Sequence, residues 1–94
     1  MESLLFASGI PMTSTLHNPD YRAFVSHLSG LRVQLGVTQA ELAKRLGKPQ
    51  SFVSKAERFE RRIDPGEFRA IALALGVDPA GEFADVSHQL SKKT

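Results

Sequence analysis

Residues 38–62, TQAELAKRLGKPQSFVSKAERFERR, contain two short helical patterns that are separated by only two residues. Thr38 and Glu41 have the spacing of a capping box, which predicts that the first helix begins there. Gly47 ends this pattern, and Pro49 suits the first position of a second helix, where the N–H that proline lacks would have no partner. A connection this short forces the two helices to cross at a steep angle rather than lie antiparallel.

The second helix of this pair has two different faces. At about 100° per residue, one arc is apolar and consists of Phe52, Val53, Ala56 and Phe59. The opposite arc is polar and consists of Gln50, Ser51, Ser54, Lys55 and Arg58. The polar arc of a single helix is most often simply its solvated side, so the role of this one depends on the rest of the chain.

Helix signals flank this pair on both sides. Asp20 can cap an earlier helix, which Gly36 ends. Asp64 and Glu67 repeat the capping-box spacing, and Gly76 ends the helix that they start. Because no strand pattern is present, the sequence predicts an all-α fold of five short helices.

The expected domain spans residues 19–86, and 94 residues suffice for only one small core. A fifth helix opens near Asp78, and residues 87–94 are expected to form a C-terminal tail. Residues 1–18 are expected to form a flexible extension. Their apolar run is far shorter than the roughly 20 residues of a membrane span. No Lys or Arg precedes Arg22, whereas a signal peptide begins with a basic region. We therefore expect no membrane attachment.

Composition narrows the possible functions further. The absence of cysteine excludes disulfides and a thiolate zinc site, and it fits a reducing cytoplasm. His17, His27 and His88 lie far apart and lack ligand spacing, so we expect neither a metal nor a cofactor. Residues 44–69 carry a net charge of +4 while the rest of the chain carries −2. Such a concentration of charge suggests an anionic partner, commonly a nucleic acid.

Two short helices joined by a glycine-bearing turn, the second with a polar outer face, predict a helix-turn-helix. The major groove of DNA admits one α-helix, and the polar arc is the face that would enter it. Gln50 could pair with an adenine edge and Lys55 could donate to guanine, while Ser51 and Ser54 could serve either base. These four residues are the predicted base-reading set.

Phosphate contacts are expected around this helix. Gln39 belongs to the first turn of the preceding helix, where free N–H groups and the positive end of the dipole favour an anion. Arg58, Arg61 and Arg62 lie at and beyond the end of the second helix of the pair, and Lys48 lies in the turn. A solvated basic loop is the alternative interpretation of the three arginines.

The stretch LGVTQAELAKRLGKPQSFVSKAERFERRIDPGEFRAIALALGVDP resembles the Cro/C1-type, or XRE-type, helix-turn-helix domain of bacterial and phage repressors. The resemblance covers about residues 20–84. Its most specific positions are Thr38, Gln39, Glu41, Leu42, Ala43, Gly47, Gln50, Ser51, Val53, Ser54, Glu57 and Arg58. The resemblance implies a phosphate contact for Gln39 and base contacts for Gln50, Ser51, Ser54 and Lys55. It also implies an ion pair between Arg32 of the first helix and Glu57.

Two positions depart from the family pattern. Pro49 replaces the usual hydroxyl cap, which would contribute about 1 kcal/mol through its hydrogen bond. Phe59 stands where many members have glycine, and a left-handed backbone there would cost phenylalanine roughly 1–2 kcal/mol. Either the loop follows another path or the packing of Phe59 offsets this cost. The placement of Arg61 and Arg62 depends on which alternative holds.

The sequence therefore predicts sequence-specific binding of double-stranded DNA by a bacterial or phage transcriptional regulator, of the repressor type. The alternative is a protein-interaction module, such as an antitoxin that neutralises a toxin partner. An enzyme is disfavoured because there is no Gly-rich phosphate loop and no paired-carboxylate spacing. RNA binding is disfavoured because the aromatic residues lie mostly on core faces.

One helix-turn-helix reads only half of a typical site, so a homodimer is expected on DNA. Phe83, Val86 and Leu90 fall at i, i+3 and i+7 and form one apolar stripe. They are the predicted dimer contact, although part of the stripe is expected to cover the core of its own chain. Residues 3–10, SLLFASGI, are a second candidate.

Overall fold

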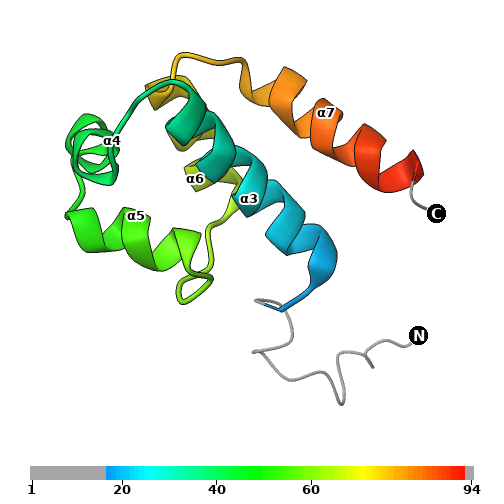
Figure 1. Cartoon of the computed structure of the whole chain (residues 1–94), viewed down its shortest axis with the longest axis horizontal. Helices are drawn as coiled ribbons and strands as arrows, with labels where there is room; N and C mark the ends of the chain where they lie inside the picture. The colour runs from blue at the N-terminus through cyan, green and yellow to red at the C-terminus, as the bar shows by residue number, and fades with distance from the viewer. Residues whose placement is uncertain (1–16, 93–94) are drawn as a thin grey trace.

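The computed structural model describes residues 17–92, and this part of the chain is entirely helical and loop (Figure 1). Its helices are α3 (Pro19–Gln34), α4 (Gln39–Leu46), α5 (Gln50–Glu57), α6 (Pro65–Ala74) and α7 (Pro79–Lys92). The prediction of an all-α fold with five short helices is confirmed. Helix α7 runs to Lys92, so most of the segment expected to be a tail is helical. Residues 1–16 of the expected extension lie outside the described residues.

Asn18, rather than the predicted Asp20, caps the start of α3. The Asn18 Oδ1 atom accepts hydrogen bonds from the backbone N–H groups of Asp20 and Tyr21, at 2.9 and 3.1 Å. Pro19 fills the first helical position, which fits its fixed φ and its missing N–H. Asp20 therefore lies inside the first turn, where its charge complements the positive end of the helix dipole.

The two predicted capping boxes differ. Asp64 and Glu67 form a complete box, since the side chain of each accepts from the backbone N–H of the other, at 2.7 and 3.0 Å. The Thr38 hydroxyl accepts from the Glu41 N–H at 3.0 Å. However, the Glu41 carboxylate binds Arg45 one turn later and does not reach back to the cap. The expected box at the start of α4 is thus only half formed.

Four helices end in the same way, with a residue of positive φ after the last turn. These residues are Gly36 (φ 72°), Gly47 (φ 68°), Gly76 (φ 81°) and Phe59 (φ 61°). At each end the following residue donates its N–H back into the last helical turn, as Glu60 does to the Lys55 carbonyl at 2.8 Å. This is the Schellman arrangement, which satisfies carbonyls that would otherwise lack a partner.

The core lies between α3, α4, α5 and α6. Its buried side chains are Val25, Leu28, Val37, Leu42, Ala43, Phe52, Val53, Ala56, Ile63, Ile71, Ala72 and Leu75. Helix α7 packs on α3 and α6, on the far side of these helices from α5 (Figure 1). Val86 is buried in this contact, and His27 Nε2 lies 2.6 Å from Glu82 Oε1, which joins α3 to α7. The outer side of α5 is therefore left uncovered by the rest of the described chain.

Candidate nucleic-acid interface

Helices α4 and α5 form a compact two-helix unit around a tight turn. The left-handed conformation of Gly47 reverses the chain after α4, and α5 begins three residues later. Leu42 and Ala43 on α4 are buried in the same core as Phe52 and Val53 on α5. The unit is thus fixed to the body of the protein by its apolar sides, as the helix-turn-helix prediction required.

The opposite side of α5 carries the predicted base-reading residues. Gln50, Ser51 and Lys55 are exposed, while Ser54 is half-buried. The Ser54 hydroxyl lies 3.4 Å from the carbonyl of Ser51, at the long limit of a hydrogen bond. Three of the four side chains are therefore free to contact a ligand, and Ser54 lies at the edge of that face.

Pro49 is the N-cap of α5, not its first helical residue as the sequence suggested. Its ψ of 153° is extended, and no side chain caps this end of the helix. The first N–H groups of α5 are consequently left for solvent or for an acceptor on a ligand. The departure from the family's hydroxyl cap thus leaves donors at the end of the helix that carries Gln50 and Ser51.

Arg32, Gln39 and Glu57 form one hydrogen-bonded network that joins α3, α4 and α5. Arg32 donates from Nε to Glu57 Oε2 at 2.7 Å and from Nη2 to Glu57 Oε1 at 2.9 Å. A third nitrogen of Arg32 donates to the Val37 carbonyl at 2.7 Å. Gln39 Nε2 donates to Glu57 Oε1 at 2.9 Å. Both oxygens of the Glu57 carboxylate are therefore occupied.

The pair implied by the family resemblance is well shielded from water. The side chains of Arg32 and Glu57 are only 12% and 15% exposed. The pKa of Arg32 is raised above its ordinary value, first by the hydrogen bond to Glu57, although burial acts in the opposite direction. A shielded bidentate pair holds its geometry better than a surface pair. It therefore fixes the end of α5 against the last turn of α3.

Most of the predicted phosphate-binding arginines have acidic partners within the chain. Arg58 makes two hydrogen bonds to Glu60, at 3.0 and 3.1 Å. Arg61 makes two hydrogen bonds to Glu67, at 3.1 and 3.2 Å, and its guanidinium lies 4.4 Å from the centre of the Phe52 ring. The pKa of Arg61 is raised above its ordinary value, first by its hydrogen bonds to Glu67. Both arginines would have to share or exchange a partner to bind a phosphate.

Lys48 and Arg62 make no ion pair within residues 17–92 and remain the freer cations near α5. Lys48 Nζ lies 5.5 Å from the centre of the Phe52 ring. Phe52 thus contacts two cations, Lys48 and Arg61, although the ring itself is buried. The sequence placed Phe52 in the core but gave no signal that it also positions these side chains.

The backbone at Phe59 decides between the two paths that the sequence left open for the loop after α5. Its backbone is left-handed, as at the glycine of the family pattern, and its ring packs against the core. The guanidinium of Arg22 lies 4.3 Å from the centre of the Phe59 ring. The loop therefore keeps the left-handed path, and packing of the ring offsets the cost.

Comparison with known proteins places this chain among helix-turn-helix proteins. A family model described as helix-turn-helix matches residues 28–81. An XRE-family like protein from Pseudomonas syringae pv. tomato str. DC3000 is 44% identical, with a TM-score of 0.75, over 82% of this chain and 94% of that one. The chain belongs to the XRE family of helix-turn-helix proteins.

A second solved structure is also similar to this chain. A hypothetical transcription factor, NHTF, from Neisseria is 29% identical, with a TM-score of 0.60, over 80% of this chain and 82% of that one. No curated protein matches the chain. The XRE family consists of DNA-binding transcription regulators, so the expectation drawn from the sequence is confirmed at the level of the family.

In the XRE fold, the three residues of the predicted dimer stripe differ in how exposed they are. Val86 is only 3% exposed and packs inside its own chain, so little of its side chain is left for a contact with a second copy. Leu90 is half-buried, while Phe83 is 52% exposed. The stripe is amphipathic because its middle faces α3 and α6, and periodicity alone cannot separate that role from an interface between copies.

Two tertiary contacts hold the helix-turn-helix and the loop after it in place, and neither was predicted from the sequence. Arg45 on α4 donates to the Ala74 carbonyl at the end of α6, at 2.9 Å. The Tyr21 hydroxyl accepts from the Ile63 N–H at 2.8 Å and fixes the loop that follows Arg61. Among residues 17–92, no helix is long and apolar enough to cross a membrane, and no group of side chains could hold a metal ion.

Proposed function

We propose that this XRE-family chain is a sequence-specific regulator of transcription, of the repressor type, which inserts α5 into the major groove of DNA. The observation that carries the proposal is the exposed polar face of α5 on a helix whose other face is locked in the core. Gln50, Ser51 and Lys55 point away from the buried Phe52 and Val53. A rigid helix with such a face fits the dimensions and the donor–acceptor pattern of the major groove.

In this proposal each side chain has a distinct role. Gln50 reads adenine and Lys55 reads guanine, while Ser51 permits close approach and Ser54 supplies a hydroxyl at the edge of the contact. The uncapped start of α5 adds backbone donors beside Gln50. These contacts select a sequence, because each base pair presents a different pattern in the major groove.

Gln39 is proposed to bind a phosphate in a fixed orientation. One hydrogen of its amide is used in the bond to Glu57, which leaves the second hydrogen and the free N–H groups of the first α4 turn as donors. The dipole of α4 favours an anion at the same place. Lys48 and Arg62 add positive charge, and Arg58 and Arg61 contribute if a phosphate replaces or shares their carboxylate partners.

The proposed regulator acts as a homodimer on its operator, with two α5 helices about 34–36 Å apart on one face of the DNA. A lone half-site would give limited affinity and specificity, because each correct base contact contributes only about 1–3 kcal/mol. Symmetric pairing predicts an inverted-repeat operator. Selection of bound sites from random duplex DNA would identify it.

Substitutions on the selected site test the assigned roles. Gln50→Ala and Lys55→Ala should each weaken binding by about 1–3 kcal/mol and relax base preference at one position. Gln39→Ala should weaken all sites alike, because a phosphate carries no sequence information. Lys92→Ala, on the last turn of α7, is the control and should leave binding unchanged.

Fluorescence anisotropy on the selected site and on its single-base variants measures both effects. The same uniform loss for Gln50→Ala, Lys55→Ala and Gln39→Ala would show that α5 does not read bases. Failure of random-site selection to enrich any sequence would remove the proposal in favour of a protein-interaction role.

A further inference from the structure

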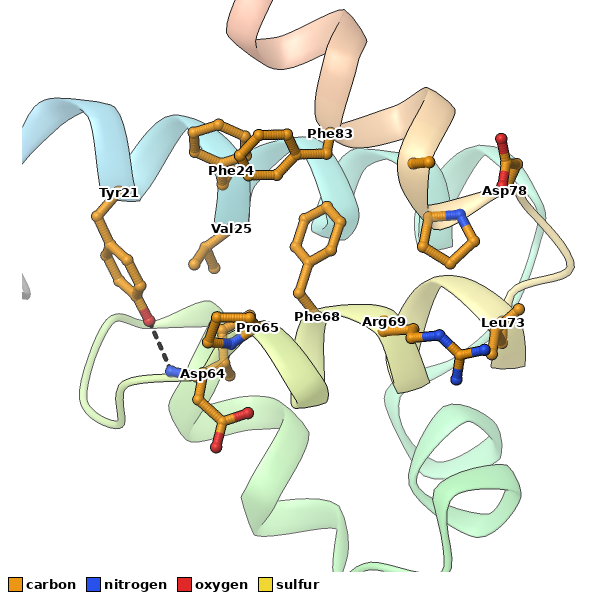
Figure 2. Close-up of a pocket in the computed structure, with 13 residues that line it drawn as sticks. Tyr21, Phe24, Val25, Asp64, Pro65, Phe68, Arg69, Leu73, Asp78 and Phe83 are labelled. Atoms are coloured by element: carbon orange, nitrogen blue, oxygen red, sulfur yellow. Dashed lines mark hydrogen bonds between the residues drawn. The ribbon is translucent and has the colours of Figure 1, made fainter.

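An apolar groove lies between α3, α6 and α7, away from the helix-turn-helix face (Figure 2). Its volume of about 670 Å³ is large enough for several side chains. The rings of Phe24 and Phe83 are stacked, with centroids 4.6 Å apart, and Phe68 meets both edge-on at 6.2 and 6.1 Å. Figure 2 shows these three rings between the two ends of the groove, with Tyr21 at one end and Leu73 at the other.

Large exposed hydrophobic side chains concentrate at this groove. Of the four in residues 17–92, Leu73 on α6 and Phe83 on α7 line it, and they are 49% and 52% exposed. The other two, Val33 and Leu35, are not part of its lining. Monomeric proteins rarely expose a large contiguous apolar patch, and such patches commonly mark contact sites.

The charged side chains of the lining do not favour a charged occupant. They are Asp64, Arg69 and Asp78, which carry both signs. Asp64 accepts a hydrogen bond from the Glu67 N–H at 2.7 Å, and Asp78 accepts one from the Gly81 N–H at 3.1 Å. Both carboxylates are thus already engaged at helix starts. The groove therefore fits an apolar segment with few charges.

The chain's own N-terminal segment has this character. Among residues 1–16, Glu2 is the only charged side chain. The large apolar side chains of the segment are Met1, Leu4, Leu5, Phe6, Ile10, Met12 and Leu16. A segment of this composition can bury apolar surface against the aromatic cluster without placing a charge there.

The segment also joins the described part of the chain beside the groove. The described residues begin at His17, and Tyr21 in the first turn of α3 already lines the groove. The chain between Phe6 and Asn18 can span up to about 40 Å when extended. The segment can therefore turn back along α3 and reach Leu73 at the other end. A short tether keeps its local concentration near the groove in the millimolar range.

A second copy of the chain fits the groove less well than this segment. The groove is bounded by α7, which lies on the far side of α3 and α6 from α5 (Figure 1). A copy seated there would turn its α5 away from the first α5, whereas a dimer reads DNA with both helices on one face. The chain's own segment leaves α5 uncovered and makes no such demand.

We propose that residues 4–12 dock in this groove of their own chain. Leu5 and Phe6 cover Leu73 and Phe83, and Ile10 lies nearer the Tyr21 end. The docked segment ties α7 to α3 and α6 and shields the aromatic cluster from water. The proposal gives residues 3–10 a partner within their own chain instead of the contact between copies considered from the sequence, and it does not depend on DNA binding.

A spin label tests the location of the segment in the full-length protein. The chain has no cysteine, so Ser8→Cys can carry a single nitroxide. The nitroxide should broaden the amide NMR signals of Leu73 and Phe83 and leave that of Ser51, on the outer side of α5, sharp. In a mixture of unlabelled nitroxide-bearing protein and isotope-labelled protein without nitroxide, no signal should broaden. Sharp signals at Leu73 and Phe83, or equal broadening in the mixture, would overturn the proposal.

A double-mutant cycle tests whether the segment and the groove contact each other. Leu5→Asp and Leu73→Asp should each raise the unfolding equilibrium constant about tenfold, because each undocks the segment. The double variant should unfold little more readily than either single variant. Leu35→Asp is the matched control, since Leu35 has the same 49% exposure as Leu73 but lies outside the groove. Its effect should add to that of Leu5→Asp. Additive effects of Leu5→Asp and Leu73→Asp would overturn the proposal.

Binding of DNA separates this proposal from the proposed function. Leu5→Asp should bind a duplex with a single half-site as tightly as the wild type does, because the groove lies away from α5. Weaker binding by Leu5→Asp would overturn the proposal by placing the segment at the DNA. Failure of the wild type to bind any duplex would remove the proposed function and leave the spin-label result standing.

Two other occupants of the groove would also overturn the proposal. Dimers in sedimentation velocity that are lost in Leu73→Asp, but are unaffected by Leu5→Asp, would show that a second copy fills the groove. A small apolar molecule that wild-type monomers retain in native mass spectrometry, and that Leu73→Asp loses, would make the groove a ligand site.

Discussion

Phe59 shows how one residue can keep a conformation that its side chain disfavours. Its φ of 61° places it in the left-handed region, where the other Schellman ends of the fold have glycine. The conformation costs phenylalanine roughly 1–2 kcal/mol. The half-buried ring offsets this cost through its contacts with the core and with the Arg22 guanidinium. The loop that carries Arg61 and Arg62 therefore keeps its path without glycine.

Two substitutions separate the backbone cost from the packing of the ring. Phe59→Gly and Phe59→Ala both remove the ring, so we expect both to be less stable than the wild type. Phe59→Gly should be the more stable of the two by about 1–2 kcal/mol, because only alanine retains the left-handed strain. Urea unfolding measures the difference. Ala70→Gly, on the exposed side of α6, should show the ordinary order, with glycine less stable by roughly 0.5–1 kcal/mol. An alanine variant at 59 as stable as the glycine variant would contradict this account.

Glu57 illustrates a residue that acts on the proposed site without facing the DNA. Its carboxylate receives three hydrogen bonds, two from Arg32 and one from Gln39. Gln39 is therefore already oriented for the proposed phosphate contact, which lowers the entropy that such binding would have to remove. The resemblance implied the Arg32–Glu57 pair, but the bond to Gln39 could not be inferred, because it depends on the crossing of α4 and α5.

At the scale of the elements, α6 is fixed by a cap and an ion pair that share one carboxylate. Glu67 Oε1 accepts from the Asp64 N–H, and both Glu67 oxygens also bind Arg61. The pKa of Glu67 is lowered, first by the hydrogen bonds from Arg61 and against the effect of burial. Glu67 thus ties the loop after α5 to the start of α6.

Glu67→Gln removes the charge but retains an oxygen that can accept from the cap. Because the folded-state pKa of Glu67 is lowered, its ionised form stabilises the fold above the unfolded-state value of about 4.3. This contribution is lost as the pH falls through the folded-state pKa. Above about pH 5 the variant should be less stable by a few tenths to about 1 kcal/mol, since the pair is partly solvated. The difference should disappear in strong acid.

Thermal unfolding of wild type and Glu67→Gln across pH measures this difference. Glu60→Gln is the matched control, because it breaks the Arg58 pair, in which both side chains are more than half exposed. It should change stability less than Glu67→Gln. A Glu67 effect that persists unchanged in strong acid would show that the charge is not its source.

Local signals predicted the elements well, because capping and positive φ are properties of a few neighbouring residues. Gly36, Gly47 and Gly76 marked three helix ends correctly. The errors arose where two local choices were both allowed. Proline's fixed φ fits the cap and the first helical position equally, and only the ψ of Pro49 distinguishes them. Asn18 and Asp20 are both good caps, and Pro19 between them decides in favour of Asn18.

The candidate site was less predictable than the fold, because side-chain partners depend on tertiary contacts. Phosphate contacts were predicted for Arg58 and Arg61, and the sequence did not reveal that each has a carboxylate partner within the chain. Arg61 lies near several acids in the sequence, and only the path through Phe59 brings it to Glu67. The stripe of Phe83, Val86 and Leu90 was likewise correct as a pattern, but the packing of α7 buries its middle residue.

At the scale of the whole molecule, the distribution of paired and unpaired cations determines how binding responds to salt. The net charge of the chain is only +2, yet residues 44–69 carry +4. Within residues 17–92, Lys48, Lys55 and Arg62 make no ion pair, whereas Arg58 and Arg61 do. A cation that already binds a carboxylate gains less free energy from a contact with a phosphate. Lys48, Lys55 and Arg62, which lie on or near α5, are therefore expected to dominate counterion release.

Lys55 is assigned to a base edge, but its charge enters the groove between the phosphates and still displaces counterions. Three such cations in each copy, six in a dimer, predict a slope of log affinity against log salt near −5. Partial exchange of Arg58 and Arg61 onto phosphates would make the slope as steep as about −7. Lys48→Ala should reduce its magnitude by about 2, because each copy loses one contact. Arg61→Ala should reduce it less, since that variant also frees Glu67 and leaves a nearby negative charge. Anisotropy titrations on the full operator, from low to moderate salt, measure these slopes. A slope near zero would exclude DNA as the partner, and equal changes for the two variants would show that pairing within the chain does not govern the phosphate contacts.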